Sequence, residues 1–297
     1  MFYVFPYFLL INGVCHIDFK KLFWGENVMI IIFAFLLLLM CVGCRIHLKG
    51  LDENYLSMNY TQAIKGIFII FVFLSHVRTY AEYTLASDLF VIRILDYLGQ
   101  LMVAMFLFYS GYGVFESVKK KGKTYIDSFV INRIGKTFID FSFAICLFLI
   151  VDVIVEKTYS IPHILLSFTG WTSVGNSNWY MFTIFALYLM TFICFKIGGK
   201  KRLISLILFT VCSFGYVFIM SAIHQPTRFS NTSLCYMAGM WYSYFKSEID
   251  CFLKKHQFYY YVITLCLIGL YLYTYPFKGT RLLWFNGVSI LHNIRKI

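Results

Sequence analysis

Uninterrupted apolar runs limit what this chain can fold into more than any other feature. A helix needs about 20 predominantly apolar residues to cross a bilayer core about 30 Å thick. The ten-residue alternating strands of an outer-membrane barrel are not seen. The sequence therefore predicts an all-α, polytopic integral membrane bundle with about eight or nine membrane helices. The clearest runs cover residues 28–44, 63–76, 138–155, 179–195, 203–223 and 258–275.

Composition excludes a water-soluble domain. Hydrophobic residues make up 60% of the chain and charged residues 13%, whereas about a quarter of a soluble domain is charged. The formal net charge of +12 could indicate a nucleic-acid-binding protein, but no nucleic-acid motif accompanies the basic residues, which lie between the apolar runs. We therefore expect a lipid bilayer and no nucleic acid as partner.

The basic residues instead indicate topology. Sixteen of the 26 Lys and Arg residues lie in four alternate connections, while the connections between these hold eight. By the positive-inside rule the four rich connections are cytoplasmic and segment 156–178, which has the Pro and Gly of turns or a re-entrant segment, is external. This pattern predicts a multi-pass protein of a cell (inner) membrane. The four rich connections are 45–65, 116–136, 196–202 and 246–257.

Two parts of the chain are predicted. Residues 1–58 form an N-terminal extension with one membrane helix, and residues 59–297 form the main membrane domain. The nine cysteines are spread singly, apart from one CxxC at Cys41 and Cys44. No second pair or histidine cluster completes a zinc site, so no metal is predicted.

Lys65 and His76 are candidate functional residues. An ionisable group is costly to place in a membrane helix, so by default it is expected to have a function there. They are eleven residues apart, a rotation only about 20° beyond three full turns, with a rise of about 16 Å. Both side chains therefore share one helix face and could line one groove. The alternative is a lysine at the membrane boundary and a histidine bonded to a carbonyl at the helix end.

A second pair of cations, Arg133 and Lys136, lies in NRIGK. Residues three apart are neighbours on an α-helix, and a planar guanidinium beside a point charge suits a nucleotide-linked diphosphate. Ordinary positive-inside anchoring is the alternative.

Small and aromatic residues form the remaining candidates. Ser110 and Gly111 in FLFYSGYG permit close backbone approach, either of a neighbouring helix or of a ligand. Trp179 and Tyr180 in NSNWY lie at the predicted outer interface, where an aromatic belt is the simple explanation.

These segments, in this order, resemble the membrane acyltransferase family 3, which includes bacterial glycan O-acetyltransferases. KGIFIIFVFLSHV is similar to the family's basic-x10-His helix, MFLFYSGYGVF to its second core helix, and NRIGK followed by NWYMFTIFALYL to the next motifs. The resemblance covers about Asn59 to Trp241. Lys65 and Lys136 replace arginines common in the family, and the family's late helices have no counterpart after Ile297. The resemblance therefore predicts that the chain is truncated at its C-terminus or has diverged there.

The resemblance implies an O-acyltransferase that transfers an acyl group, most often acetyl, from acyl-CoA to a hydroxyl of a glycan or lipid-linked sugar. His76 would act as general base, with a transient acyl-His76 as the less favoured variant. No permanently bound cofactor or metal is expected.

The resemblance also implies roles for the other candidates. Arg133 and Lys136 would hold the CoA phosphates, Lys65 would line the entrance, and Ser110 with Gly111 would let the pantetheine arm pass. Trp179 and Tyr180 would contact the acceptor.

Two other functions remain open at this point. A histidine and cations lining a groove also suit a membrane transporter or lipid-linked-sugar flippase. A truncated acyltransferase could also be inactive.

Overall fold

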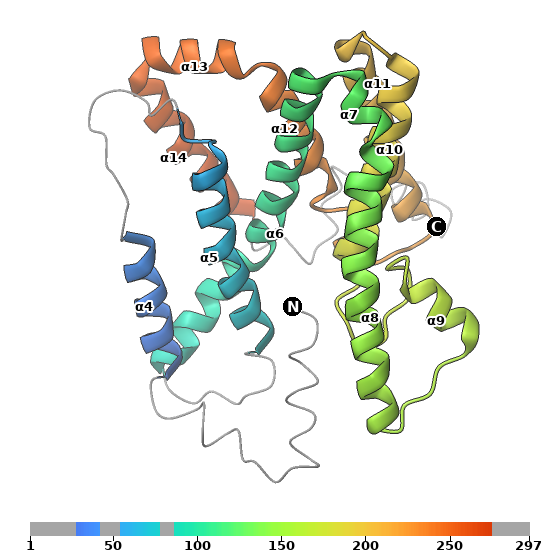
Figure 1. The fold of residues 1–297 in the computed structure, drawn as a ribbon. Helices are drawn as coiled ribbons and strands as arrows, with labels where there is room; N and C mark the ends of the chain where they lie inside the picture. Colours follow the sequence, from blue (N-terminus) through green and yellow to red (C-terminus); the bar gives the residue numbers. More distant parts are fainter. Residues whose placement is uncertain (1–27, 42–53, 78–85, 275–297) are drawn as a thin grey trace, which may run out of the picture.

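The computed structural model describes residues 28–41, 54–77 and 86–274, and in these ranges the regular secondary structure is helical, without strands (Figure 1). η2 is a π-helix and η3 a 3-10 helix. In chain order the elements are α4 (Val28–Cys41), α5 (Met58–Val77), α6 (Ala86–Lys121), α7 (Lys123–Asp127), η2 (Val130–Gly135), α8 (Lys136–Ile154), α9 (Ile161–Ser167), α10 (Trp179–Gly198), α11 (Arg202–Ala222), η3 (Thr227–Phe229), α12 (Ser233–Tyr244), α13 (Lys246–Lys255) and α14 (Gln257–Thr274).

The described part of the chain contains five helical segments that are long and apolar enough, by length and composition, to cross a membrane. Two shorter apolar helical stretches, Ile30–Leu39 and Phe258–Tyr273, accompany them. The predicted all-α membrane architecture is therefore confirmed, whereas the total of eight or nine membrane helices stays a prediction. The five segments are Met58–His76, Asp88–Lys121, Val130–Ile154, Trp179–Gly198 and Arg202–Ala222.

Large apolar side chains cover the outside of these helices. Ile139 and Phe143 on α8 are each 67% exposed, and Val153 further along the helix is 76% exposed. A water-soluble monomer rarely exposes a continuous apolar surface of this kind. Lipid chains would cover it in a bilayer.

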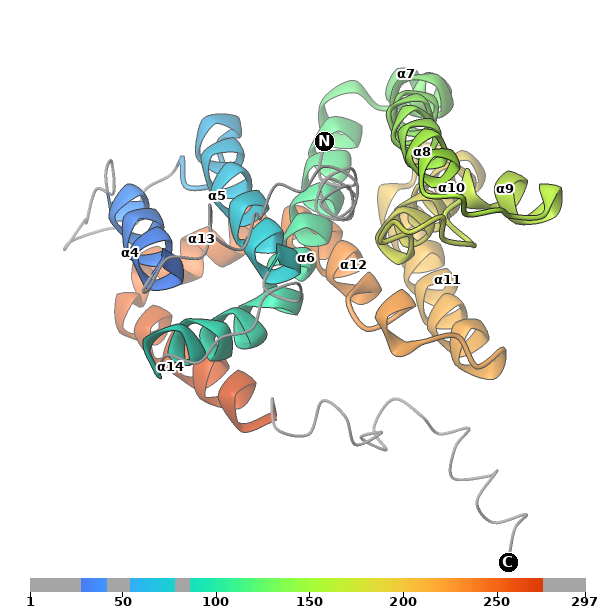
Figure 2. The same ribbon diagram turned by 90° about the horizontal axis from the view of Figure 1, so that it is seen from below.

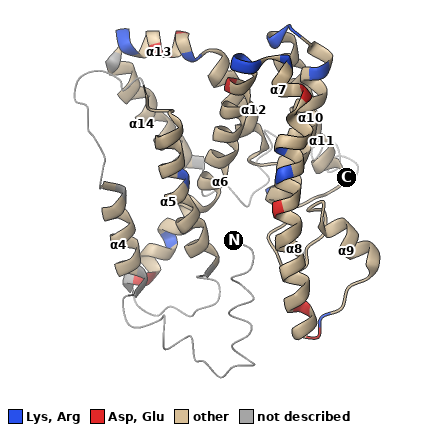
Figure 3. Ribbon diagram, in the orientation of Figure 1, with Lys and Arg blue, Asp and Glu red and all other residues tan. Residues whose placement is uncertain are grey.

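Basic residues gather at one end of the bundle, where α13, α7 and the turn between α10 and α11 lie (Figure 3). The other end carries fewer of them in the described ranges. We call the first end the basic end. The positive-inside rule predicts that it faces the cytoplasm.

Two hydrophobic cores share the long helix α6. Figures 1 and 2 show from two directions that α4 and α5 lie on one side of α6 and that α8, α10 and α11 lie on the other. The first core joins α4 and α5 to the N-terminal half of α6. The second core joins the C-terminal half of α6 to α7, α8, α10, α11 and α12. α6 and α12 therefore lie between the two sides of the molecule.

Two glycines allow α6 and α12 to pack backbone against backbone. A Cβ atom added at Gly111 would lie 2.0 Å from the carbonyl oxygen of Tyr236, and one at Gly239 would lie 2.1 Å from that of Phe108. No side chain fits at these distances. Close approach through small residues is how membrane helices gain packing contacts.

The predicted connection 116–136 differs from the structure, because most of it is helical. α6 continues to Lys121, Gly122 breaks the helix with a φ of +56°, and α7 and η2 follow. The buried side chains of Ile126 and Phe129 hold this segment against the second core. Segment 156–178 has its predicted turns, and the short helix α9 lies within it.

The segment that precedes α5 is tied to α13 at the basic end. The hydroxyl of Tyr55 donates a hydrogen bond to Asp250 Oδ1 at 2.7 Å, and Lys246 Nζ lies 4.9 Å from the centre of the Tyr55 ring. Burial, together with hydrogen bonds to Tyr242 and Asp250, holds the pKa of the Tyr55 hydroxyl well above its usual value. The described end of the predicted N-terminal extension thus contacts the main membrane domain.

Candidate functional site

Arg133 lies on the π-helical segment η2, where the backbone leaves the α-helical repeat. Phe129, one turn earlier, is fully buried and packs edge-on against Tyr125 with ring centroids 5.5 Å apart. The half-buried Arg133 donates from Nε to the Tyr125 hydroxyl at 3.1 Å. π-helical turns are rare and frequently occur at functional sites.

Lys65 extends from α5 toward the region around Arg133. Its side chain is half-buried and its Nζ lies 5.5 Å from the centre of the Tyr109 ring. Lys65 and Arg133 are close enough for their charges to interact repulsively. In the described part of the chain, the ion pairs between side chains involve other residues, so neither cation has a carboxylate within ion-pairing distance.

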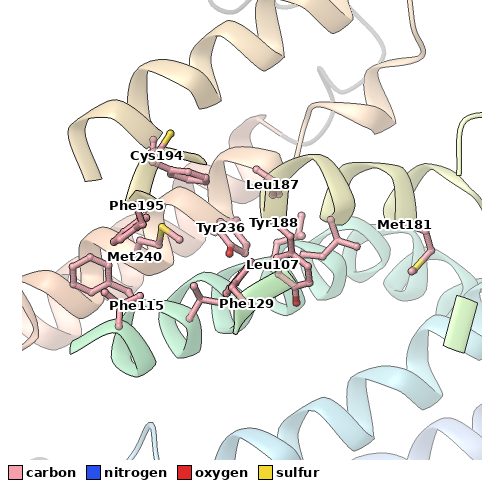
Figure 4. Close-up of a cluster of buried hydrophobic side chains, with 14 of the residues drawn as sticks. Leu107, Phe115, Phe129, Met181, Leu187, Tyr188, Cys194, Phe195, Tyr236 and Met240 are labelled. Carbon is pink, nitrogen blue, oxygen red and sulfur yellow. The ribbon is translucent and has the colours of Figure 1, made fainter. Parts of the chain in front are cut away.

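Hydroxyl groups of α6, α10 and α12 also lie in the region around Arg133. Ser110 Oγ and Tyr188 Oη share a hydrogen bond of 3.0 Å, and Tyr236 Oη lies 3.1 Å from Thr191 Oγ1. The rings of Tyr188 and Tyr236 pack edge-on with centroids 6.1 Å apart, and Tyr188 packs in the same way on Phe129 (Figure 4). Both tyrosines also interact electrostatically with Arg133.

The two cations and the tyrosine and serine side chains around them form what we call the cation–tyrosine cluster. It lies where the first core, through α5, meets the second core, through η2, α10 and α12. Two cations without an acidic partner within ion-pairing distance repel each other, and the repulsion is stronger at low dielectric. An anion with several oxygen atoms would offset that repulsion and accept hydrogen bonds from the hydroxyls. The cluster comprises Lys65, Tyr109, Ser110, Tyr125, Arg133, Tyr188 and Tyr236.

Arg133 and its predicted neighbour Lys136 differ in exposure. Lys136 is the first residue of α8 and is exposed, whereas Arg133 is half-buried. Lys136 follows the π-helical turn directly, and its main-chain N–H donates to the carbonyl of Arg133. In the folded protein, Arg133 and Lys65 belong to the same cation–tyrosine cluster.

Ser110 and Gly111 occupy different surroundings although they are adjacent. Ser110 belongs to the cation–tyrosine cluster through its hydrogen bond to Tyr188. Gly111 faces the backbone of Tyr236 on α12, the arrangement expected if it serves helix packing. Passage of a pantetheine arm beside these residues stays a prediction.

His76 lies on the same continuous helix as Lys65, as the sequence predicts. It is in the last turn of α5, is exposed and is about 16 Å along the helix axis from Lys65. The structure therefore places His76 three turns away from the cation–tyrosine cluster, toward the end of the bundle opposite the basic end (Figures 1 and 3).

Trp179 and Tyr180 begin α10, and both are half-buried. Their rings pack edge-on with centroids 6.2 Å apart, and Trp179 also packs against the buried cluster that contains Tyr216 and Phe229. The side chain of Asn178 fixes this helix start by donating to the carbonyls of residues 170 and 171 at 2.8 and 3.0 Å. The two aromatic residues are thus far from the basic end.

Sequence reasoning missed the tyrosines of the cluster. Tyr125, Tyr188 and Tyr236 lie in or beside apolar helices, where a hydroxyl needs a partner when buried. That requirement was the available signal, but 23 tyrosines make it unspecific. The CxxC motif cannot be described as a pair, because Cys44 lies outside the described residues.

Comparisons with protein-family models, with curated proteins and with solved structures found no match to this chain. The resemblance to membrane acyltransferases therefore rests on the four motifs, and the function that it implies is a proposal.

Proposed function

We propose that this chain is a membrane-embedded O-acyltransferase that moves an acyl group, preferentially acetyl, from acyl-CoA to a hydroxyl of a glycan or lipid-linked sugar. The observation that carries the proposal is that Lys65, beside the Tyr109 ring, and Arg133, bonded to Tyr125, bring two cations to the cation–tyrosine cluster without a carboxylate in the described ranges to neutralise them. The diphosphate of acyl-CoA supplies the negative charge that this pair lacks.

The two cations suit different parts of a diphosphate. Arg133 offers a planar fork of donors, and Lys65 offers a compact charge that can follow a phosphate oxygen. The hydroxyls of Tyr125 and Ser110, which belong to the same cluster, would add neutral hydrogen bonds to the diphosphate. Lys136, exposed at the start of α8, would contact the nucleotide portion that remains outside.

The distance between the phosphate site and His76 is compatible with the shape of acyl-CoA. A long, flexible pantetheine arm separates the thioester from the diphosphate, and the two candidate sites are about 16 Å apart along α5. Acyl-CoA bound by its phosphates at the cluster would extend its thioester along α5 toward His76.

The chemistry at His76 is general-base catalysis of acyl transfer. The neutral imidazole takes the proton of the acceptor hydroxyl while the oxygen attacks the thioester carbonyl carbon. The carbon–sulfur bond then breaks, CoA leaves as the thiolate, and the imidazolium returns the proton to the sulfur. Trp179 and Tyr180 would hold the acceptor near the end of the bundle where His76 lies, and the enzyme would reside in the inner membrane.

Binding of CoA to the purified full chain tests the proposal. The double variant Lys65→Gln/Arg133→Gln should bind CoA at least tenfold more weakly, because charge-assisted hydrogen bonds contribute about 1.5–3 kcal/mol each. Arg93→Gln, which removes an exposed arginine of α6, is the matched control and should bind normally. Equal binding by the double variant and the control would overturn the phosphate site.

A lipid-linked sugar also carries phosphate, so the flippase alternative needs its own measurement. The purified protein in vesicles should transfer radiolabelled acetyl from acetyl-CoA to added glycan or lipid-linked sugar. Movement of lipid-linked sugar across the vesicle membrane without acetyl transfer would favour the flippase and reject the acyltransferase.

A further inference from the structure

Two turns from distant parts of the chain converge at the basic end. α7, which follows the turn after α6, is joined to the last turn of α10 by Lys196 Nζ, which lies 2.6 Å from Asp127 Oδ1. Arg202 Nη2 also donates to the main-chain carbonyl of Lys119 at 3.1 Å. In Figures 1 and 3, α7 and the ends of α10 and α11 lie together at this end, with basic residues on them.

The acidic residues of these turns are already paired. Glu116 lies 2.5 Å from Lys119, and Asp127 is bonded to Lys196, a hydrogen bond that holds the pKa of the Asp127 carboxyl below its usual value. The other basic side chains at the helix ends beside these two turns are exposed, and in the ranges that the structure describes none forms an ion pair with a carboxylate, although Lys123 is near enough to Asp127 to help lower its pKa. We call this set the basic patch; it comprises Lys120, Lys121, Lys123, Lys200, Lys201 and Arg202.

Exposed apolar side chains continue directly from the basic patch into the membrane-spanning part of α10 and α11. Ile197 is 72% exposed, and Leu203 and Ile204 are 42% and 44% exposed. The positive-inside rule accounts for the number of basic residues on this side. It does not require two turns far apart in the sequence to converge into one patch above an apolar surface.

We propose that the basic patch binds the phosphate headgroups of anionic phospholipids, whose acyl chains lie along the exposed apolar side chains of α10 and α11. Clustered cations at the membrane surface bind anionic headgroups, and each lysine or arginine adds to the affinity. A soluble anion would use the cations but gain nothing from Ile197 and Leu203. The combination therefore fits a lipid, and it does not depend on the acyltransferase proposal.

A lipid titration on the full chain in detergent tests this proposal. Lys200→Gln/Lys201→Gln removes two adjacent lysines of the basic patch. Lys254→Gln/Lys255→Gln removes two adjacent exposed lysines of α13 at the same end of the molecule and is the matched control. Retention of phosphatidylglycerol is measured by native mass spectrometry and its effect on the thermal unfolding midpoint by scanning fluorimetry, with phosphatidylcholine as the neutral reference.

Phosphatidylglycerol should bind and stabilise the unmodified chain and the α13 control, and phosphatidylcholine should not. The patch variant should bind phosphatidylglycerol about fivefold more weakly for each lysine removed. Lys200→Arg/Lys201→Arg, which keeps the charge, should restore binding, and the unfolding midpoint of the Gln variant without lipid should match that of the unmodified chain and show that it is folded. Equal loss in both Gln variants would reduce the effect to overall charge and overturn the proposal. Full displacement of the lipid by inorganic diphosphate at equal concentration would identify a soluble-anion site and also overturn it.

Discussion

The two cores of this molecule are built in different ways. The first core consists of apolar and aromatic side chains from α4, α5 and the N-terminal half of α6, such as Phe33 and Phe71, whose rings pack edge-on 5.9 Å apart. The second core and the small buried cluster of Tyr216, Met220 and Phe229 beside it add hydrogen bonds between helices. Thr183 Oγ1 on α10 and Tyr216 Oη on α11 both donate to the main-chain carbonyl of Phe229, at 2.9 and 2.8 Å.

The difference has a physical reason in a lipid environment. Lipid chains are as apolar as leucine, so apolar contact alone gives little driving force for helix association in a membrane. Hydrogen bonds and close backbone packing specify an arrangement more narrowly. We therefore expect the second core to be the rigid part of the molecule and α5, with Lys65 and His76, to be the part that can adjust when a ligand reaches the cation–tyrosine cluster.

The largest expected effect tests the rigidity of the α6–α12 contact. Gly111→Ala places a Cβ atom 2.0 Å from a main-chain carbonyl oxygen of α12, so the helices must separate. Overpacking typically costs about 1–3 kcal/mol and more where backbone must move. The variant should lose most of its folded yield and unfold at a clearly lower temperature in detergent.

Gly113→Ala is the matched control, because nothing lies within 4 Å of a Cβ added there. It should change stability by less than about 1 kcal/mol. If the two variants unfolded alike, the backbone contact would not be what distinguishes the second core.

The next effect concerns chemistry on the adjustable side. His76→Ala should lower acyl transfer about 10²-fold or more, because that is the usual contribution of a positioned general base. His76→Gln can form hydrogen bonds but cannot take a proton at neutral pH, so it should be nearly as inactive. Thermal unfolding and CoA binding should stay normal in both variants. Recovery of most activity by the Gln variant would assign His76 a hydrogen-bonding role.

The elements of both cores could be predicted from apolar runs, but their partners could not. The run 179–195 predicts α10, which spans Trp179–Gly198, because a membrane helix must satisfy its backbone internally. Segment 116–136 was expected as a connection, since its lysines mask the apolar anchors Ile126 and Phe129. Local sequence carries no information about which surface these anchors bury.

The candidate site shows the same limit. Lys65 and Arg133 each stand out in the sequence as cations beside apolar helices, and both belong to the cation–tyrosine cluster. Their common place in the cluster depends on how helices far apart in the sequence pack, and the π-helical form of η2 has no signature in NRIGK. The local sequence therefore indicates which residues are candidate cations. Which cations lie together depends on the tertiary structure.

A smaller effect is expected from the hydrogen bonds of the Tyr216–Phe229 cluster beside the second core. Thr183→Val/Tyr216→Phe removes both donors to the Phe229 carbonyl. Hydrogen bonds between membrane helices average about 0.6 kcal/mol and reach about 1.7, so the double variant should lose about 1–2 kcal/mol in a denaturant titration. Thr264→Val on α14, whose hydroxyl bonds within its own helix, is the control. If the double variant were as stable as the control, these hydrogen bonds would not be what distinguishes this side of the molecule from the first core.

The smallest effect should come from the exposed pair Asp127–Lys196, which ties α7 to α10 at the margin of the second core. A hydrogen bond from Lys196 lowers the pKa of Asp127 in the folded protein. A lowered folded-state pKa stabilises the fold above the unfolded-state value, near 3.9, and the contribution is lost as pH falls through the folded-state pKa. Asp127→Asn should therefore unfold slightly earlier than the unmodified chain at pH 6, and the two should converge below about pH 3. Thermal unfolding at both pH values measures this. Solvent screens such exposed pairs, so a loss at pH 6 as large as that of Gly111→Ala would show that surface ties, and not the interior contacts, hold the second core together.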